Sequence, residues 1–234
     1  MTIENVNIVR TSHYQSMSDH PPAKRPYGGV PSEERQRQRH DKLIDAGIRI
    51  FGSKGFHGAT VREICVEAHL TERYFYESFK NMSELFIAVY SQVRQELMDQ
   101  TKTALRHAKP GPDELLEASL RVFLEFIRND PYRARIFLIE ALSIGRGVIH
   151  VSGETARDYS NLLLKFIHNM YPDAERFGVR LDLMTAGLIG MNIHLATRWV
   201  NENFATPIDV VLRSNMLPYH GLLALLKQGI PDKA

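Results

Sequence analysis

The sequence has one cysteine, no long apolar run and almost no net charge. Because Cys65 cannot form an internal disulfide by itself, the chain suits a reducing compartment, and we expect it in the cytoplasm. No stretch approaches the roughly 18 apolar residues of a membrane span, and the N-terminus lacks a signal peptide's apolar block, so no membrane partner is expected. The 29 Lys and Arg against 27 Asp and Glu are too balanced to indicate a nucleic-acid partner by themselves.

Signatures of metal binding and catalysis are missing as well. The ten histidines form no H-x-x-x-H pair and have no cysteine partner at ligand spacing. The C-terminal two thirds of the chain show no Ser/His/Asp group, paired carboxylates or glycine-rich phosphate loop. We therefore predict no metal, no cofactor and no catalytic residue. An α-helical enzyme that uses the C-terminal part is the alternative from another functional class, and turnover in hydrolase or transferase assays would support it.

Strand-like alternation is also absent, and from Ser32 onward the apolar residues repeat at helical spacing. We predict an all-α protein, whose 234 residues can bury one large core or two modest ones. Residues 1–31 are polar and proline-bearing, so we expect a disordered extension, within which Met17 is an alternative start. A three-helix domain over residues 32–82 and a helical domain over residues 83–234 are expected to follow.

Local capping signals divide the first domain into helices. A first helix is predicted from about residue 33 to 53, with Gly55 as its C-terminal stop. A second begins at Thr60, which can form a capping box with Glu63. The apolar spacing of this second helix turns Cys65 inward, which favours a buried structural thiol over a redox sensor.

The third predicted helix, TERYFYESFK over residues 71–80, contains four aromatic rings. Phe75 and Phe79 are four residues apart and form its buried face. Tyr74 points nearly opposite to them and Tyr76 lies on the flank, so both rings need a partner outside this small unit. Two short helices joined by a turn, with Thr, Arg and Tyr facing outward on the second, describe a helix-turn-helix that enters the DNA major groove. We therefore predict a double-stranded DNA operator as partner.

The run from residue 42 to 85, KLIDAGIRIFGSKGFHGATVREICVEAHLTERYFYESFKNMSEL, resembles the DNA-binding domain of TetR-family (TetR/AcrR) transcriptional regulators. The shared features are a first helix ending in F-x-x-x-G-[FY], then A-T, then V-R-E-I, a tyrosine and phenylalanine three apart, and a capped fourth helix. The resemblance implies a homodimer whose final helix pair packs against its twofold mate as a four-helix bundle.

The resemblance also implies a set of DNA-contacting residues: Thr60, Arg62, Thr71, Arg73, Tyr74 and Tyr76. We add Glu72 and Lys80 as further candidates on the same segment. Within this set, Arg73 and Tyr74 are expected at base edges or thymine methyl groups. The threonines, Arg62 and Tyr76 are expected at phosphates, which position the protein without specifying sequence. Glu72 can accept from a cytosine amine, or it can serve as a capping or solvated residue.

Three residues depart from the family pattern. His69 stands at the turn where glycine is frequent, although histidine tolerates a positive φ better than most residues. Glu72 and Met82 stand where lysines are frequent, so we expect Arg73, Lys80 or the arginines at 35, 37 and 39 to supply the missing phosphate contacts. A solvated helix start is an equal alternative for these three arginines.

Six further helices are predicted, with Asn81 and Asp130 as N-caps and with breaks near prolines and glycines. The expected ranges are about 81–107, 113–129, 130 to just before Gly145, 152–170, 179–203 and 207–228.

Large rings accumulate in the middle helices, which favours a cavity of about 300 Å³ or more for an apolar or amphipathic small-molecule effector. A close-packed core would explain the same residues. The candidate ligand-binding residues are Phe86, Phe123, Phe126, Phe137, Tyr159, Leu163 and Phe166.

The last two helices have more apolar surface than one small domain can cover, so we predict a homodimer. The candidate interface residues are Gly187, Met191, Leu195, Trp199, Val211 and Leu222, and His194 is expected in the core. The main hypothesis is a dimeric repressor that an apolar or amphipathic molecule releases from a palindromic operator. A DNA-binding regulator without an effector is the alternative within the same class.

Overall fold

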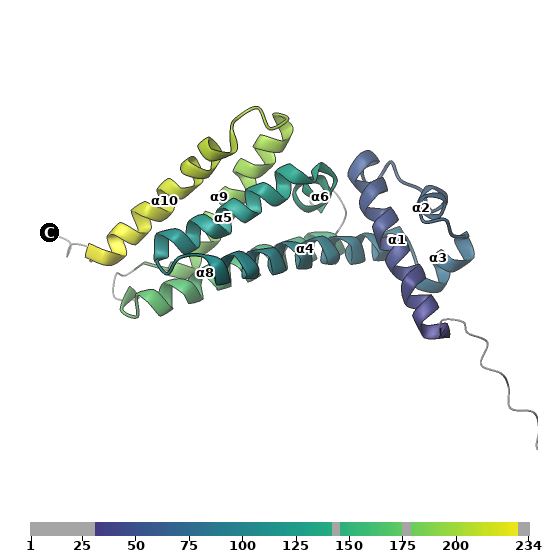
Figure 1. Cartoon of the computed structure of the whole chain (residues 1–234), viewed down its shortest axis with the longest axis horizontal. Coiled ribbons are helices and arrows are strands. Elements are labelled where there is room, and N and C mark those ends of the chain that lie inside the picture. The colour runs from purple at the N-terminus through teal and green to yellow at the C-terminus, as the bar shows by residue number, and fades with distance from the viewer. Residues whose placement is uncertain (1–30, 142–145, 175–178, 229–234) are drawn as a thin grey trace, which may run out of the picture.

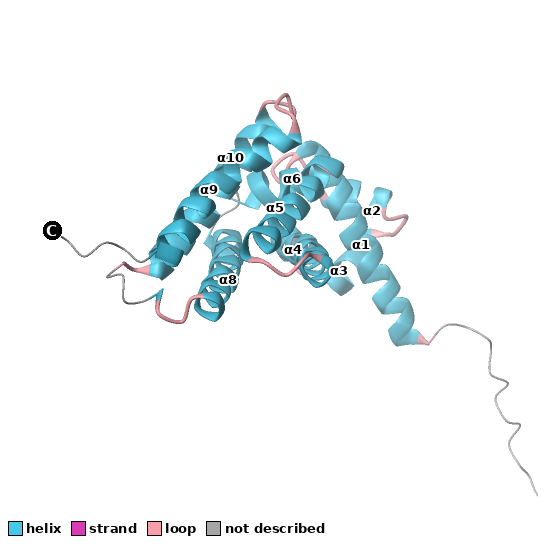
Figure 2. Ribbon diagram, turned by 60° about the vertical axis from the view of Figure 1, so that its left-hand side comes forward, coloured by secondary structure: helices cyan, strands magenta, loops and turns pink. Residues whose placement is uncertain are grey.

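The computed structural model describes residues 31–141, 146–174 and 179–228. These residues form helices and contain no strand, which confirms the all-α prediction. Figures 1 and 2 show a small group of N-terminal helices at one end of a larger helical body. The predicted N-terminal extension lies outside the described residues, apart from Pro31.

The N-terminal group consists of α1 (Ser32–Lys54), α2 (Val61–Glu67) and α3 (Glu72–Ser78). The predicted capping box starts α2: the Glu63 amide donates to the Thr60 hydroxyl, and the Thr60 amide donates to the Glu63 carboxylate at 3.0 Å. His69 has a φ of 55°, the left-handed conformation that glycine adopts most easily, so the sequence departure at this turn is accommodated. Phe75 and Phe79 are buried, as is Cys65, in agreement with the sequence.

Helix α4 (Met82–His107) begins at Asn81, whose side chain accepts from the Glu84 amide at 2.9 Å. Its first turns pack against α1 so closely that a Cβ on Gly47 would lie 2.6 Å from Val89. It then runs from the N-terminal group into the larger body (Figure 1). One hydrophobic core follows this helix from Phe51 in α1 to Phe137 beyond the junction.

The larger body contains α5 (Pro112–Asn129), α6 (Pro131–Arg135), the π-helix η1 (Ile136–Glu140), α8 (Arg146–Met170), α9 (Leu181–Asn201) and α10 (Ile208–Gln228). A second core forms where α5, α8, α9 and α10 meet, around Leu124, Ile167 and Leu212. The predicted N-cap Asp130 is confirmed, because its carboxylate accepts from the Arg133 amide at 3.0 Å.

Two boundary predictions were wrong. Helix α8 begins at Arg146, not at Ser152, because one interior glycine such as Gly147 costs only about 1 kcal/mol relative to alanine and need not end a helix. The helix expected from residue 130 is divided into α6 and η1. In η1 the backbone hydrogen bonds join residues five apart instead of four, as in a π-helix. Single π-helical turns occur mostly inside other helices and often at functional sites.

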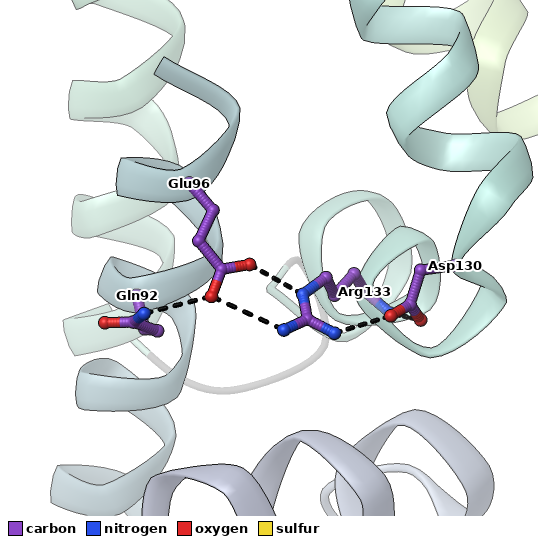
Figure 3. Close-up of polar contacts among 4 residues, drawn as sticks. All are labelled: Gln92, Glu96, Asp130 and Arg133. Carbon is purple, nitrogen blue, oxygen red and sulfur yellow. Dashed lines mark hydrogen bonds and ion pairs between the residues drawn. The ribbon is translucent and has the colours of Figure 1, made fainter. Parts of the chain in front are cut away.

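Polar contacts fix α6 against α4, as Figure 3 shows. The Arg133 Nε donates to Glu96 Oε2 at 2.7 Å, and Nη1 of the same guanidinium donates to Asp130 Oδ2 at 2.5 Å. Gln92 donates to the other Glu96 oxygen at 2.9 Å. Because a planar guanidinium holds both carboxylates at once, these bonds determine the orientation of α6 as well as its position.

Helix α1 touches α6 through Gly52, where a Cβ would lie 2.6 Å from the Tyr132 Cα atom. We expect Gly52→Ala to force the two helices apart and to lower the free energy of unfolding by about 1 to 3 kcal/mol. The matched control is Gly153→Ala in α8, where a Cβ would meet nothing within 4 Å, and a helical alanine is normally favourable. Thermal unfolding followed by circular dichroism compares them. Equal melting temperatures would mean that α6 can move away freely.

Candidate nucleic-acid interface and ligand cavity

The residues expected to contact DNA are solvent-exposed on and around α2 and α3, with one exception. The Arg73 side chain is 84% exposed, and Tyr76 is 59% exposed. The Arg73 guanidinium pairs with Glu77 one turn later, at 2.9 Å. The other exposed members of the set are Thr60, Arg62, Thr71, Glu72 and Lys80. Apart from the Glu72 carboxylate, which only accepts hydrogen bonds, the exposed members of this set are donors that a phosphate backbone can reach.

Tyr74 is the exception, because its ring is half-buried under Arg39 of α1. The guanidinium carbon lies 4.5 Å from the ring centroid, a cation–π arrangement that holds both side chains. An Arg39 nitrogen also lies 4.0 Å from Glu77 of α3. Arg39 thus packs against the recognition helix, whereas the neighbouring Arg37 pairs with Glu34 of its own helix.

A cavity of about 750 Å³ lies in the larger body, lined from α4, α5, η1, α8, α9 and α10. This volume exceeds the expected minimum of about 300 Å³, which confirms the prediction of a cavity, and it lies within the usual range for small-molecule sites. Most of the lining side chains are apolar. Five of the predicted ligand-binding residues lie on its wall: Phe123, Phe137, Tyr159, Leu163 and Phe166.

Phe86 and Phe126 do not lie on the cavity wall, so the sequence placed them wrongly. Phe86 belongs to the part of α4 that faces the DNA-binding helices, and its ring lies 5.2 Å from that of Phe51. Phe126 is buried in the same core. Both rings are core residues because aromatic content alone does not say which face of a helix points into a cavity.

A few polar groups interrupt the apolar wall, and the sequence reasoning missed most of them. The Asn192 amide nitrogen donates to the Tyr219 hydroxyl at 2.6 Å. Burial raises the pKa of Tyr219 to about 12, and it also raises the pKa of Tyr159. Lys165 and Asn169 line the cavity on exposed turns of α8. The sequence feature that could have indicated a polar group in the cavity is Asn192, an asparagine inside the apolar run GLIGMNIHLA.

Three predicted interface residues are buried inside the chain instead. Trp199, Val211 and Leu222 belong to the second core, and the Trp199 indole donates to the Thr206 carbonyl at 2.7 Å. Met191 and Leu195 are half-buried, and Gly187 is exposed. The large rings and branched side chains of α9 and α10 therefore pack first against their own chain.

The outer surfaces of α9 and α10 carry a different, mainly apolar set of residues, which we call the α9–α10 face. On α9 it comprises Leu183, Gly187, Gly190 and His194, and on α10 it comprises Val210, Leu217, Gly221 and Leu225. Leu217 and Leu183 are 71% and 63% exposed. The expectation of a core position for His194 was wrong, because the helical period places it beside the exposed glycines.

Along the described segments, every helix is too short or too polar to cross a bilayer. In this arrangement, an exposed helix-turn-helix is joined by α4 to a hollow helical body. It is the architecture of a DNA-binding regulator with a separate ligand-binding domain. Residues 43–89 match the family model of the bacterial regulatory proteins of the tetR family. This segment of the chain is therefore a DNA-binding domain of the kind found in TetR/AcrR-family transcriptional regulators.

Similar proteins extend the likeness beyond the DNA-binding domain. The transcriptional activator FasR of Mycolicibacterium smegmatis is 26% identical over 195 residues, which cover 80% of this chain and 83% of FasR. The fatty acid degradation regulator FadR of Bacillus halodurans matches with a TM-score of 0.66 and 18% identity over 83% of this chain and 97% of its own. FadR of Bacillus subtilis, solved in complex with stearoyl-CoA, matches with a TM-score of 0.67 and 19% identity over 82% and 99%. The two solved structures share the fold.

Tyr76 provides a test of the DNA-binding face. We expect Tyr76→Phe to weaken binding to every duplex by about 1 to 3 kcal/mol, because it removes one hydrogen bond to a charged phosphate and no base contact. Fluorescence anisotropy measures this with duplexes that the wild type selects from a random pool and with one unrelated duplex. Tyr132→Phe on α6, another exposed tyrosine, is the control. Equal DNA affinities of the two variants would show that the Tyr76 hydroxyl does not contact DNA.

Proposed function

We propose that this chain is a homodimeric repressor that leaves a palindromic operator when a long-chain acyl compound enters the cavity. The observation that carries the proposal is the apolar cavity of about 750 Å³, whose walls include α4 and η1, two elements that also pack against the DNA-binding helices. The stearoyl-CoA bound to Bacillus subtilis FadR supports the choice of ligand. We assign residues 32–82 to DNA binding and residues 83–234 to ligand binding and dimerisation.

A polar route connects the cavity to the DNA-binding helices through η1. Phe137 and Leu138 line the cavity, and Glu140 follows two residues later. One oxygen of the buried Glu140 carboxylate accepts from the Phe56 amide at 2.8 Å, and the other accepts from Arg135 at 2.9 Å. This carboxylate therefore holds the turn between α1 and α2.

Arg135 binds the end of α1 as well as Glu140. Its Nη1 donates to the Ser53 carbonyl at 3.0 Å, one of the last α1 carbonyls, which have no partner within the helix. Gly55 is tightly enclosed, since a Cβ there would lie 2.9 Å from both Arg135 and Glu140. A shift of η1 by a ligand must consequently move the end of α1 or break these bonds.

An apolar route runs along α4. The rings of Tyr90 and Phe137 stack almost parallel, with centroids 5.6 Å apart, and both residues line the cavity. One turn before Tyr90, Phe86 packs against Phe51 of α1. A ligand that displaces the stacked pair therefore changes the angle at which α4 meets the DNA-binding helices.

Release requires that the ligand binds the DNA-incompetent arrangement more tightly than the competent one. Coupling between two such sites is typically about 1 to 3 kcal/mol, or roughly 5 to 150-fold in affinity. Since the coupling is reciprocal, operator DNA must weaken ligand binding by the same factor.

Filling the cavity tests this mechanism. We expect stearoyl-CoA to lower the operator affinity of the wild type by roughly 5 to 150-fold. Leu163→Trp should abolish this response and keep DNA binding, because Leu163 lies on the cavity wall. Met170→Trp, on the exposed end of the same helix, should respond like the wild type. Anisotropy titrations with and without stearoyl-CoA measure all three proteins. An unchanged wild-type affinity would refute the proposed ligand response.

Dimerisation is assigned to the α9–α10 face defined above. Its leucines are exposed while its glycines have open space around them, so a second copy can approach both helices closely. A twofold protein that presents two recognition helices requires half-sites about one DNA turn, roughly 34 to 36 Å, apart.

Leu217→Glu tests this face. We expect the variant to sediment and scatter light as a monomer of 26.8 kDa, because a carboxylate would be buried at the centre of the interface without a partner. Val66→Glu, which alters an exposed apolar residue of α2, should leave the mass of the wild-type dimer unchanged. A monomeric wild type, or a dimeric Leu217→Glu, would place the interface elsewhere.

Activation is the second candidate, because FasR is named a transcriptional activator. In a strain that lacks the gene, rising transcript levels from the bound promoters support a repressor, and falling levels support an activator.

A further inference from the structure

The cavity contains a buried amide whose oxygen has no hydrogen-bond partner. Asn192 lies on the cavity wall and is only 6% exposed. Its Nδ2 donates to the Tyr219 hydroxyl at 2.6 Å, while its Oδ1 has no hydrogen-bond partner. Turning the amide over would exchange these roles, and one polar atom would still be left without a partner.

Such a group is unusual, because buried polar atoms in proteins are nearly always paired. By contrast, the Thr101 hydroxyl on the same wall donates to the Leu97 carbonyl at 2.8 Å. Tyr219 holds the Asn192 side chain in one place, so the free amide atom has a defined position. The pair therefore has the geometry of a preformed recognition site for one neutral polar group.

We propose that the effector is an acyl chain with a hydroxyl group along its length, and that Asn192 binds this hydroxyl while Tyr219 orients the amide. The inference rests on the proposed function, in which an acyl compound occupies the cavity. A hydroxyl suits the site because it can donate to Oδ1 or accept from Nδ2. An unsubstituted chain would leave the amide atom without a partner in an apolar environment, at a cost to affinity.

The charged end of the ligand needs solvent and a nearby cation, which the apolar surroundings of Asn192 do not provide. Among the described residues that line the cavity, Lys165 is the one with a charged side chain, and it lies on an exposed turn of α8. A carboxylate or phosphate is stable there, near solvent and a cation, and it would be costly beside the neutral Asn192. The acyl chain therefore enters the cavity with its apolar end first, and its hydroxyl reaches Asn192 and Tyr219 inside.

The experiment compares stearoyl-CoA with a series of hydroxystearoyl-CoA isomers that differ in the hydroxyl position, by calorimetry on the full-length protein. We expect one isomer to bind about 10-fold more tightly than stearoyl-CoA, the effect of one well-placed neutral hydrogen bond. The double variant Asn192→Leu with Tyr219→Phe makes this wall apolar and should lose the preference while it still binds stearoyl-CoA. Tyr219→Phe alone retains the amide but removes the hydroxyl that orients it, so it should reduce the preference for the hydroxylated acyl chain without abolishing it.

The outcomes separate this inference from the proposed function. If stearoyl-CoA binds and every hydroxylated isomer binds equally or more weakly, the cavity takes acyl chains and a buried water satisfies Asn192, which overturns the inference alone. If the double variant keeps the preference, the hydroxyl is bound elsewhere and the assignment to Asn192 is wrong. If none of these compounds binds the wild type, the acyl ligand itself is wrong, and the proposed function fails with the inference.

Discussion

A hydrophobic core that crosses from the DNA-binding helices into the larger body is the constraint on which the rest of this structure depends. Leu43 of α1 and Ile64 of α2 share this core with Ile127 and Ile136 beyond the junction. Helix α4 runs through its middle, so neither part can repack without the other. Because interiors are packed to crystal-like density, a displacement on one side of such a core is transmitted rather than absorbed.

Charged groups add direction to this apolar contact. Arg133 and Arg135, two residues apart, bind carboxylates on different elements: the first faces Glu96 of α4, and the second faces Glu140 and the end of α1. Hydrophobic contact alone would let the helices slide, since it is non-directional. The forked guanidinium groups restrict the junction to one orientation. In the coupling proposed between ligand and DNA, the second state would be one in which some of these discrete bonds are broken.

The second core does not fill the larger body. Helices α8, α9 and α10 pack together around Ile167 and Leu212, yet a cavity of about 750 Å³ lies between these helices and α4. An empty apolar space costs stability, and a ligand that fills it returns the lost contacts. The unused amide atom of Asn192 is a second cost at the same place. Both costs are explained together if the cavity is a binding site.

Sequence reasoning determined what depends on near neighbours. The Thr60 cap follows from a local spacing, and the resemblance over residues 42–85 marked the turn at His69, whose φ is positive. Tertiary structure alone decided which apolar residues face a cavity, a core or the solvent. Phe86 and Phe123 have the same chemistry, yet one packs against α1 and the other lines the cavity, because their helices meet different neighbours. A helical period shows that a face is apolar and cannot show what covers it, since that depends on residues far away in the chain.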